Sequence, residues 1–422
     1  MNIKKNLTRH RTVVENFSYI TLLQLFVLIA PLVLYPYLIR VLGAEIYGWV
    51  ILSQVIVAYC SIFVDFGFND VSARLVALNK SDRQMIGEIV SSILFVRSTM
   101  WIICFLIYLV VIFSFASYRQ HWVLFVIAYG LTLKDLLFLQ FYFQGTEKMK
   151  FVTLVSMAAR IISLFLIMVF VKKQSQYILV PALISFGYLV GGFYSMFLVF
   201  KKEKIPFVIP RWQTIKICTK DASLLLSTNL ITTIKDKLNY ILLASCVAVD
   251  QIVIYDLGSK FNALLSKPAS IISMVLLPKF SVSRNVRAIK RIMKWLFLFV
   301  FLCVLIFNIF MPPVVEFFLK KESVDLLPIR LYSMAPIFLS VSIYIANNVM
   351  TALGELKYLV YSIVVTTIAY LFLLGAFFCL GRLDTVAVFV FITLLSFIVE
   401  MIYRLWVANK IFAKQGLDKR FK

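Results

Sequence analysis

The sequence predicts an all-α polytopic membrane protein with twelve transmembrane helices in two six-helix lobes. Of its 422 residues, 62% are apolar, whereas a soluble domain has about 45–50% apolar residues. The apolar residues form runs of about 20, the length that an α-helix needs to cross a bilayer. Little sequence lies between these runs, so no loop is long enough to fold as a separate domain.

The twelve runs are the expected membrane spans. The first follows a charged start and is too long for the apolar region of a cleaved signal peptide, so we expect it to be a span. In chain order the expected spans are approximately 16–39, 47–66, 88–113, 122–143, 151–171, 177–200, 222–247, 250–277, 294–313, 330–352, 358–380 and 385–408.

A basic connection after the sixth span divides the chain into two halves. We expect an N-terminal six-helix lobe at 1–205, a basic cytoplasmic linker at 206–221 and a C-terminal six-helix lobe at 222–422. Halves with an even number of spans have the same orientation, as in parallel-repeat transporters. Prolines within or beside the spans predict bends or breaks, namely Pro31, Pro36, Pro181, Pro268, Pro312, Pro313 and Pro336.

The charge distribution predicts the topology. The chain has 43 Lys and Arg against 20 Asp and Glu, a net charge of +23, and most loop Lys and Arg fall on one side of the predicted spans. By the positive-inside rule that side is cytoplasmic, and so are both termini. The excess of Lys and Arg is therefore explained by the membrane topology and by attraction to anionic lipid in the bilayer, and we expect no nucleic-acid partner.

Cysteines, histidines and short motifs give no sign of an enzyme. The six cysteines lack paired spacing and there are two histidines, so we expect no metal site and no disulfide framework. The chain has no P-loop, no nucleophile-elbow motif, no zinc-protease motif and no dinucleotide-binding turn. We therefore predict a non-enzymatic protein without a cofactor.

Basic residues deep within the spans are the strongest functional signal. A cation at the bilayer centre costs about 2.5–3.5 kcal/mol, so such residues tend to face water, a partner charge or an anionic substrate. We expect a cationic substrate-binding cavity lined by Arg97, Lys134, Arg160, Lys235, Lys237, Lys260 and Lys267. Arg330 and Arg404 lie near span ends, where they are expected to reach the interface.

Structural ion pairs are the alternative interpretation of these cations. Possible pairs are Lys134 with Asp135, Lys235 or Lys237 with Asp236, and Lys260 with Asp256, four residues apart on one helix. Neighbours in sequence point about 100° apart, so the adjacent pairs favour partners on other helices. Arg97, Arg160 and Lys267 would still be unmatched.

Acidic and uncharged polar residues within the spans are further candidates for functional positions. Five carboxylates are candidates for ion coupling or charge pairing: Asp65, Asp135, Asp236, Asp256 and Glu400. Polar stripes along several spans predict a hydrated pathway lined by Gln54, Asn239, Tyr344 and Asn347. The alternative for such stripes is that small polar residues join helices.

Several motifs together resemble one family. The stretch from Pro36 to Gly48 contains Arg40, Gly43 and Tyr47, and the stretch 65–69 reads Asp-Phe-Gly-Phe-Asn. Similar segments occur at 143–149 and 255–260. With these motifs the chain resembles the polysaccharide transporter family of the MOP (MATE-like) exporter superfamily, whose members include O-antigen and capsule repeat-unit flippases. The family motif residues are Arg40, Gly43, Tyr47 and Gly48.

The resemblance implies a fold and a function. The fold would be a MATE-like V-shaped arrangement of the lobes in the bacterial inner membrane. The substrate would be an oligosaccharide on a polyprenyl diphosphate, typically undecaprenyl diphosphate, moved outward by alternating access and coupled to an ion gradient. A polymerase and chain-length proteins of the pathway are candidate partners. The alternatives are a multidrug or cation exporter of the same superfamily and a glycan polymerase or ligase.

Overall fold

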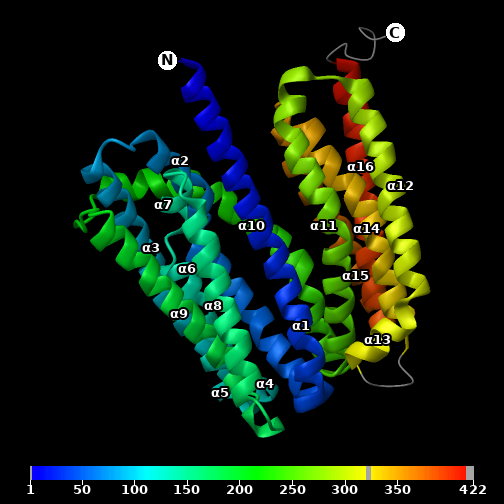
Figure 1. The fold of residues 1–422 in the computed structure, drawn as a ribbon. Coiled ribbons are helices and arrows are strands. Elements are labelled where there is room, and N and C mark those ends of the chain that lie inside the picture. Colours follow the sequence, from blue (N-terminus) through cyan, green and yellow to red (C-terminus); the bar gives the residue numbers. More distant parts are fainter. Residues whose placement is uncertain (1, 320–324, 415–422) are drawn as a thin grey trace. The chain divides into compact units, whose positions relative to one another are not determined.

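The computed structural model describes residues 2–319 and 325–414, and every regular element within those ranges is a helix (Figure 1). In these ranges ten helices are long and apolar enough to cross a membrane. The chain divides into two compact units, Met1–Thr233 and Ile234–Lys422. Each unit has its own packed helices and is described by itself.

The first unit begins with a 64-residue helix and contains several short ones. Its elements are α1 (Asn2–Asp65), α2 (Phe68–Leu78), α3 (Arg83–Ser114), α4 (Ala116–Gln120), α5 (Trp122–Ala128), η1 (Tyr129–Thr132), α6 (Leu133–Leu137), α7 (Gln140–Gly145), α8 (Met149–Phe170), η2 (Gln174–Gln176), α9 (Leu179–Phe197), η3 (Leu198–Lys202) and the first part of α10 (Trp212–Cys246).

Helix α1 covers the first two predicted spans. The helical dihedrals are interrupted at Gly43, which has φ 77° and ψ 163°, a region that is essentially restricted to glycine. Pro31 and Pro36 lie inside a continuous helical stretch, so the break predicted at the prolines lies instead at the glycine of the family motif. The predicted total of twelve spans exceeds these ten helices by two. The prediction counts α1 as two spans and also includes α10, which is not among the ten. The total of twelve therefore stays a prediction.

The span predicted at 122–143 is confirmed at Trp122–Gly145, but the helix within it is broken at Phe138 and Leu139. Phe138 has extended dihedrals, and no proline or glycine stands at the break. The freed Leu139 N–H donates to Ser195 Oγ at 3.1 Å. The Phe138 carbonyl accepts from Arg97 Nη1 at 3.5 Å. Because α3 and α9 supply these partners, the backbone groups freed by the break are hydrogen-bonded within the protein.

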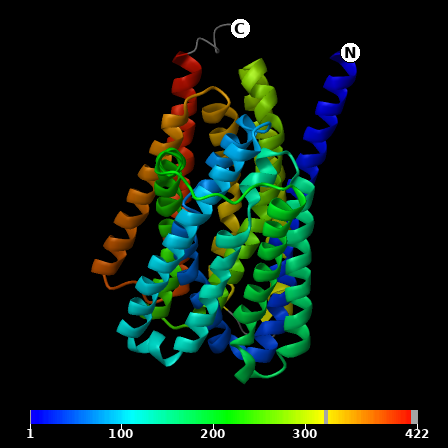
Figure 2. The ribbon, with the colours of Figure 1, turned by 90° about the vertical axis from the view of Figure 1, so that its left-hand side faces the viewer.

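Helices α8 and α9 pack side by side (Figures 1 and 2). A Cβ atom added to Gly187 of α9 would lie 2.8 Å from the Ala159 carbonyl oxygen of α8 and 2.2 Å from Ser163 Oγ. The close crossing therefore requires glycine, as is common where membrane helices pack through small residues. Short α6 packs against α9, which brings the residues before the break close to this helix pair.

The second unit consists mainly of long helices around one central helix. Helix α14 packs against α11, α12 and α16. Within the span Leu327–Thr351, which α14 begins, 61% of the most apolar 18-residue stretch is buried. Pro268 and Pro336 lie inside continuous helices, which contradicts breaks at these positions. The elements are the remainder of α10, α11 (Gln251–Ser283), α12 (Val286–Ile309), α13 (Met311–Leu319), α14 (Leu327–Ile345), η4 (Ala346–Thr351), α15 (Leu356–Cys379) and α16 (Val386–Lys414).

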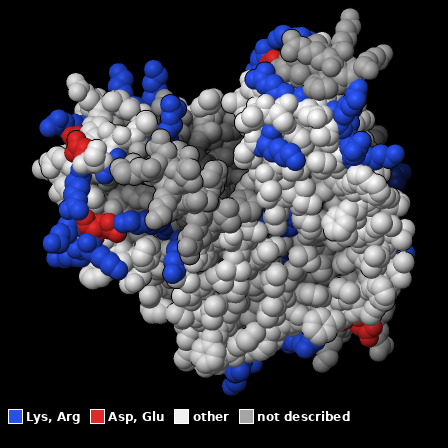
Figure 3. Space-filling view, turned by 45° about the horizontal axis from the view of Figure 1, so that its top comes forward, with Lys and Arg blue, Asp and Glu red and all other residues white. Residues whose placement is uncertain are grey.

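On the face drawn in Figure 3, Lys and Arg lie mainly toward one end of each unit, and most of the remaining surface carries no charged residue. Many large apolar side chains are exposed, among them Phe165, Phe193 and Phe372. Exposed apolar sides with charged ends are what a lipid environment stabilises. The charged side chains inside the units therefore need their own explanation.

Candidate functional site

Arg97 is ion-paired inside the first unit. Its side chain is fully buried on α3, and its Nη2 lies 2.6 Å from Asp65 Oδ1 at the end of α1. Nη2 also donates to Asn69 Oδ1 at 3.2 Å, and Asn69 Nδ2 donates to Asp65 Oδ1 at 2.6 Å. The rings of Phe68 and Phe141 lie 6.0 and 5.5 Å from the guanidinium carbon. The motif at the end of α1 thus binds the arginine, which is not left as a free cation.

A basic cavity lies beside the helix break. It has a volume of about 220 Å³, and Lys134 of α6 and Arg160 of α8 line it together with Asp135. Lys134 Nζ is 4.0 Å from Asp135 Oδ1 and 6.0 Å from the centre of the Tyr188 ring. The other lining residues are Leu23, Val27, Asn69, Phe138, Gln140, Val155, Ser156, Ala159, Tyr188, Gly191 and Gly192.

Two of the three charged side chains around this basic cavity are cations. Lys134 is half exposed, with 46% of its side-chain area accessible. Within the described ranges Arg160 has neither an ion-pair partner nor a hydrogen-bond partner. The basic cavity therefore keeps an excess positive charge and has hydrogen-bonding groups around it, an arrangement suited to a phosphate-bearing ligand.

An acidic cavity of about 320 Å³ adjoins the basic one. It is lined by Asp65 and Asp135 with Ser61, Ile62, Asn69, Asn229, Thr232 and Thr233. Asn69 and Asp135 line both cavities. Ser61 Oγ donates to Asp135 Oδ2 at 2.6 Å, so this carboxylate interacts with a hydroxyl on α1 and with the ammonium of Lys134. Asp135 is therefore placed to change the charge of both cavities on binding a proton or a cation.

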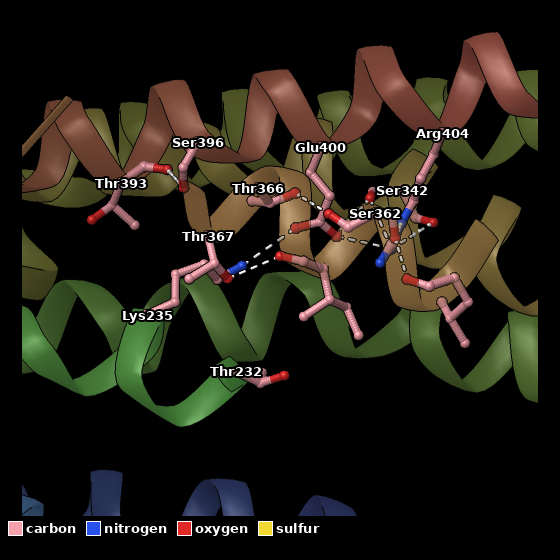
Figure 4. A network of polar contacts seen from close by, with 12 residues as sticks. Thr232, Lys235, Ser342, Ser362, Thr366, Thr367, Thr393, Ser396, Glu400 and Arg404 are labelled. Carbon is pink, nitrogen blue, oxygen red and sulfur yellow. Dashed lines mark hydrogen bonds and ion pairs between the residues drawn. The ribbon is translucent and has the colours of Figure 1, made fainter. Parts of the chain in front are cut away.

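The second unit contains a different polar cluster, centred on Glu400 of α16 (Figure 4). Its Oε1 lies 2.9 Å from Arg404 Nη1, and its Oε2 lies 3.3 Å from Lys235 Nζ on α10. Ser342 Oγ of α14 donates to Oε1 at 2.9 Å. The side chains of Glu400, Arg404 and Lys235 are only 8%, 7% and 13% exposed.

Serines from two helices complete the Glu400 network. Arg404 Nη1 donates to the Ser342 carbonyl oxygen at 3.1 Å and to its hydroxyl at 3.0 Å. Arg404 Nε donates to Ser362 Oγ of α15 at 3.0 Å. The Lys235 ammonium also lies 5.0 Å from the centre of the Phe397 ring. Side chains from four helices meet here around one buried carboxylate, which indicates a structural junction.

Two further buried groups lie in the second unit. Asn239 donates to Tyr255 Oη and Thr393 Oγ1, both at 2.8 Å, and accepts from Tyr370. Asp256 pairs with Lys260 one turn along α11, which confirms the predicted i, i+4 pair, and accepts from Tyr240 at 3.2 Å. These contacts join α10, α11, α15 and α16.

The other predicted site residues occupy varied surroundings. Lys237 lies 5.1 Å from the Tyr240 ring, and Lys267 is partly buried on α11. Tyr344 is fully buried and donates to the Ile289 carbonyl oxygen, so it packs within the core of its unit. The remaining positions divide by accessibility: Arg40, Gly43 and Asp236 are exposed, Gln54 and Asn347 are intermediate, and Tyr47 and Gly48 are buried.

Two sequence-based expectations about arginines are wrong. Arg97 was expected to lack a partner, but the crossing of α1 and α3 brings Asp65 to it. Arg404 was expected to reach the interface, but it is buried against Glu400. The i, i+4 spacing of Glu400 and Arg404 would have predicted the second pair. The expectation of a partner for Lys235 on another helix is confirmed by Glu400.

Some lining residues carried no sequence signal. Ser156 and Tyr188 line the basic cavity but resemble the polar residues that join helices elsewhere, whereas Asn69 belongs to the family motif at 65–69. Among the described residues no group of three His, Cys, Asp or Glu side chains is placed to hold a metal ion.

Comparisons with known proteins agree with this architecture. A family model described as "Polysaccharide biosynthesis protein" matches residues 13–284. Two proteins named "Putative O-antigen transporter" are similar: one from Escherichia coli (strain K12), 26% identical over 44% of this chain and 45% of its own length, and one from Shigella dysenteriae, 28% identical over 55% and 57%. The chain spans about half the length of the curated relatives it matches.

Solved transporter structures share the fold. A MATE family multidrug resistance transporter in an inward-facing conformation has a TM-score of 0.67 at 12% identity, covering 94% of this chain and 100% of its own. A Vibrio cholerae MATE transporter has 0.63 at 14%, with 96% and 98% coverage. A MOP superfamily transporter from Pyrococcus furiosus has 0.60 at 13%, with 94% and 93%. The chain has the helical fold of these MATE transporters and belongs to the polysaccharide biosynthesis protein family.

Proposed function

We propose that the protein is a flippase for a polyprenyl-diphosphate-linked oligosaccharide. It would move an O-antigen, capsule or exopolysaccharide repeat unit from the cytoplasmic to the periplasmic face of the bacterial inner membrane. The observation that carries the proposal is the basic cavity, in which Lys134 and Arg160 outnumber the single carboxylate of Asp135. The family match and the transporter fold support a transporter rather than an enzyme.

The basic cavity offers two kinds of contact to such a substrate. Lys134 and Arg160 would bind the diphosphate, because charge-assisted hydrogen bonds to phosphate are stronger than neutral ones. Asn69, Gln140 and Ser156 offer amide and hydroxyl groups that suit the hydroxyls of a sugar. Undecaprenyl diphosphate is the carrier that we propose.

The proposed transport cycle is alternating access by two six-helix lobes in a V-shaped arrangement, with twelve spans and both termini in the cytoplasm. In this cycle the broken helix near Phe138 supplies a bend next to the substrate. Discontinuous helices at substrate sites are a recurring feature of secondary transporters.

Ion coupling would act through Asp135. This carboxylate lines both the basic and the acidic cavity and lies 4.0 Å from Lys134. When a proton or a sodium ion neutralises it, Lys134 loses its counter-charge and attracts an anion more strongly. The ion and the substrate would thus influence each other's binding through one side chain, as linkage requires.

A second candidate function has one observation in its favour. The acidic cavity is lined by two carboxylates, which would suit an organic cation, the cargo of a multidrug exporter. Asp65 is paired with Arg97 and Asp135 lies 4.0 Å from Lys134, so both carboxylates already have a cationic neighbour. We therefore favour the anionic substrate.

Gene deletion in the source bacterium, with complementation by variants, tests the proposal. Loss of surface glycan with accumulation of its lipid-linked precursor inside, restored by the wild type, is the expected result. Lys134→Gln together with Arg160→Gln should fail to restore glycan at a normal protein level. A deletion strain that keeps its surface glycan but becomes sensitive to cationic drugs would instead establish the exporter.

A further inference from the structure

An apolar groove of about 550 Å³ runs along the seam of α8 and α9. It is lined by small residues, including Ala158 and Gly187, and by larger ones, including Leu154, Phe186 and Val190. These larger side chains are 51%, 52% and 45% exposed. The groove therefore lies on an apolar surface that can face lipid tails.

The groove adjoins the basic cavity. Val155, Ala159 and Gly191 line both spaces. Two of these three shared residues have the smallest side chains, so little material separates the apolar groove from the cavity that holds Lys134 and Arg160. A ligand with an anionic head and an apolar chain would match both spaces at once.

The depth of Arg160 decides which lipid fits. It lies near the middle of α8 (Met149–Phe170), roughly 15 Å from either end at about 1.5 Å per residue. The phosphate of an ordinary phospholipid stays at the interface, where it is hydrated. A carrier lipid in transit must bring its diphosphate to this depth while its chain remains in an apolar environment.

We propose that the α8–α9 groove holds the isoprenoid chain of the lipid carrier while its diphosphate lies beside Lys134 and Arg160. This inference rests on the proposed flippase function and names the route of the chain. Burial in the groove gives little selectivity by itself, because lipid tails are as apolar as its walls. Selectivity comes from the anionic head next to the groove.

Photo-crosslinking tests this placement. The full chain in phosphatidylcholine nanodiscs carries p-benzoylphenylalanine at Val190 in the groove or at Phe193, a control on the same helix that is 56% exposed and outside the groove lining. Undecaprenyl diphosphate or phosphatidylglycerol is added, and the adducts are measured by mass spectrometry. We expect a several-fold higher yield of the undecaprenyl adduct at Val190 than at Phe193, and loss of that excess in the Lys134→Gln, Arg160→Gln variant. Equal yields at the two positions, or equal capture of phosphatidylglycerol at Val190, would overturn the proposal.

A translocation assay separates this proposal from the proposed function. Ala158→Trp adds bulk to an exposed residue of the groove lining, whereas Val169→Trp adds bulk at an exposed position of α8 outside the groove. Both variants are compared with wild type for correct folding by size-exclusion chromatography. We expect Ala158→Trp to slow translocation of the lipid-linked oligosaccharide several-fold and Val169→Trp to leave it unchanged. Normal translocation by both variants would contradict the proposed role of the groove alone. Absence of translocation by the wild type would contradict the flippase function itself.

Discussion

The charge clusters of the two units differ in how completely their charges are enclosed. In the second unit Glu400 is held by two cations and a serine, and the three charged side chains are at most 13% exposed. In the first unit Lys134 is 46% exposed and Arg160 lines a cavity without an ion-pair partner among the described residues. The second cluster joins helices, whereas the first can still bind a ligand.

This difference shows that a deep cation is not by itself a substrate site. A buried charge that is paired and hydrogen-bonded on all sides has no capacity left for a ligand, and its removal harms the fold. A cation that lines a cavity keeps that capacity, and its removal harms binding. The two clusters should therefore respond to mutation in opposite ways.

The largest expected effect is on stability in the second unit. Glu400→Gln leaves Arg404 and Lys235 facing each other without the carboxylate, and we expect a loss of about 3–5 kcal/mol of stability. The measurement is thermal unfolding of the purified protein in detergent. A second substitution, Lys235→Gln, should recover part of the loss; a Glu400→Gln variant as stable as the wild type contradicts the junction.

A smaller effect, on binding, is expected in the first unit. Lys134→Gln and Arg160→Gln each remove a charge-assisted contact worth about 1.5–3 kcal/mol, roughly a ten- to hundredfold change in affinity for undecaprenyl diphosphate. Thermal unfolding should change little. Binding measured by microscale thermophoresis checks the first part, and a large fall in melting temperature would show that these cations are structural.

The backbone break at Gly43 in the first unit should not tolerate a side chain. Gly43→Ala places a β-carbon at φ 77°, ψ 163°, and we expect a cost of about 1–3 kcal/mol from backbone strain. The matched control is Gly375→Ala in α15, where an added β-carbon meets nothing within 4 Å; it should be neutral or stabilise by up to about 1 kcal/mol. Equal melting temperatures for the two variants would count against the strained turn.

Asp135→Asn is expected to have a modest effect on stability and a larger one on coupling. The amide keeps a hydrogen bond with Ser61 and loses the attraction to Lys134, a change of about 1 kcal/mol. Transport should become insensitive to an imposed proton or sodium gradient, because the shared carboxylate is gone. Retention of the wild-type gradient dependence would move the coupling site elsewhere.

The fold could be predicted from the sequence where it depends on residues close together in the chain. Apolar runs predicted the long helices, and the spacing of Asp256 and Lys260 predicted their pair. The break at Phe138 was not predicted, because its cause lies in partners from α3 and α9 rather than in a local proline. Conversely, Pro268 and Pro336 sit within continuous helices, since a packed bundle can satisfy or bypass one missing N–H.

The candidate site was predicted only in part for a related reason. Lys134, Arg160 and Asp135 were found because charge within an apolar run is rare. Whether such a charge is open or enclosed depends on residues far along the chain: Glu400 is 165 residues from Lys235, and Asp65 is 32 residues from Arg97. These contacts depend on which helices cross, and a single sequence does not reveal the crossings.

Translocation in proteoliposomes tests the central claim most directly. Purified protein is reconstituted with an undecaprenyl-diphosphate-linked oligosaccharide, and a glycosidase added outside reports how much glycan has crossed. We predict that wild type exposes the glycan and that Lys134→Gln with Arg160→Gln slows exposure at least about tenfold while its melting temperature is retained. Translocation by that variant at the wild-type rate would contradict the assignment of the basic cavity as the substrate site.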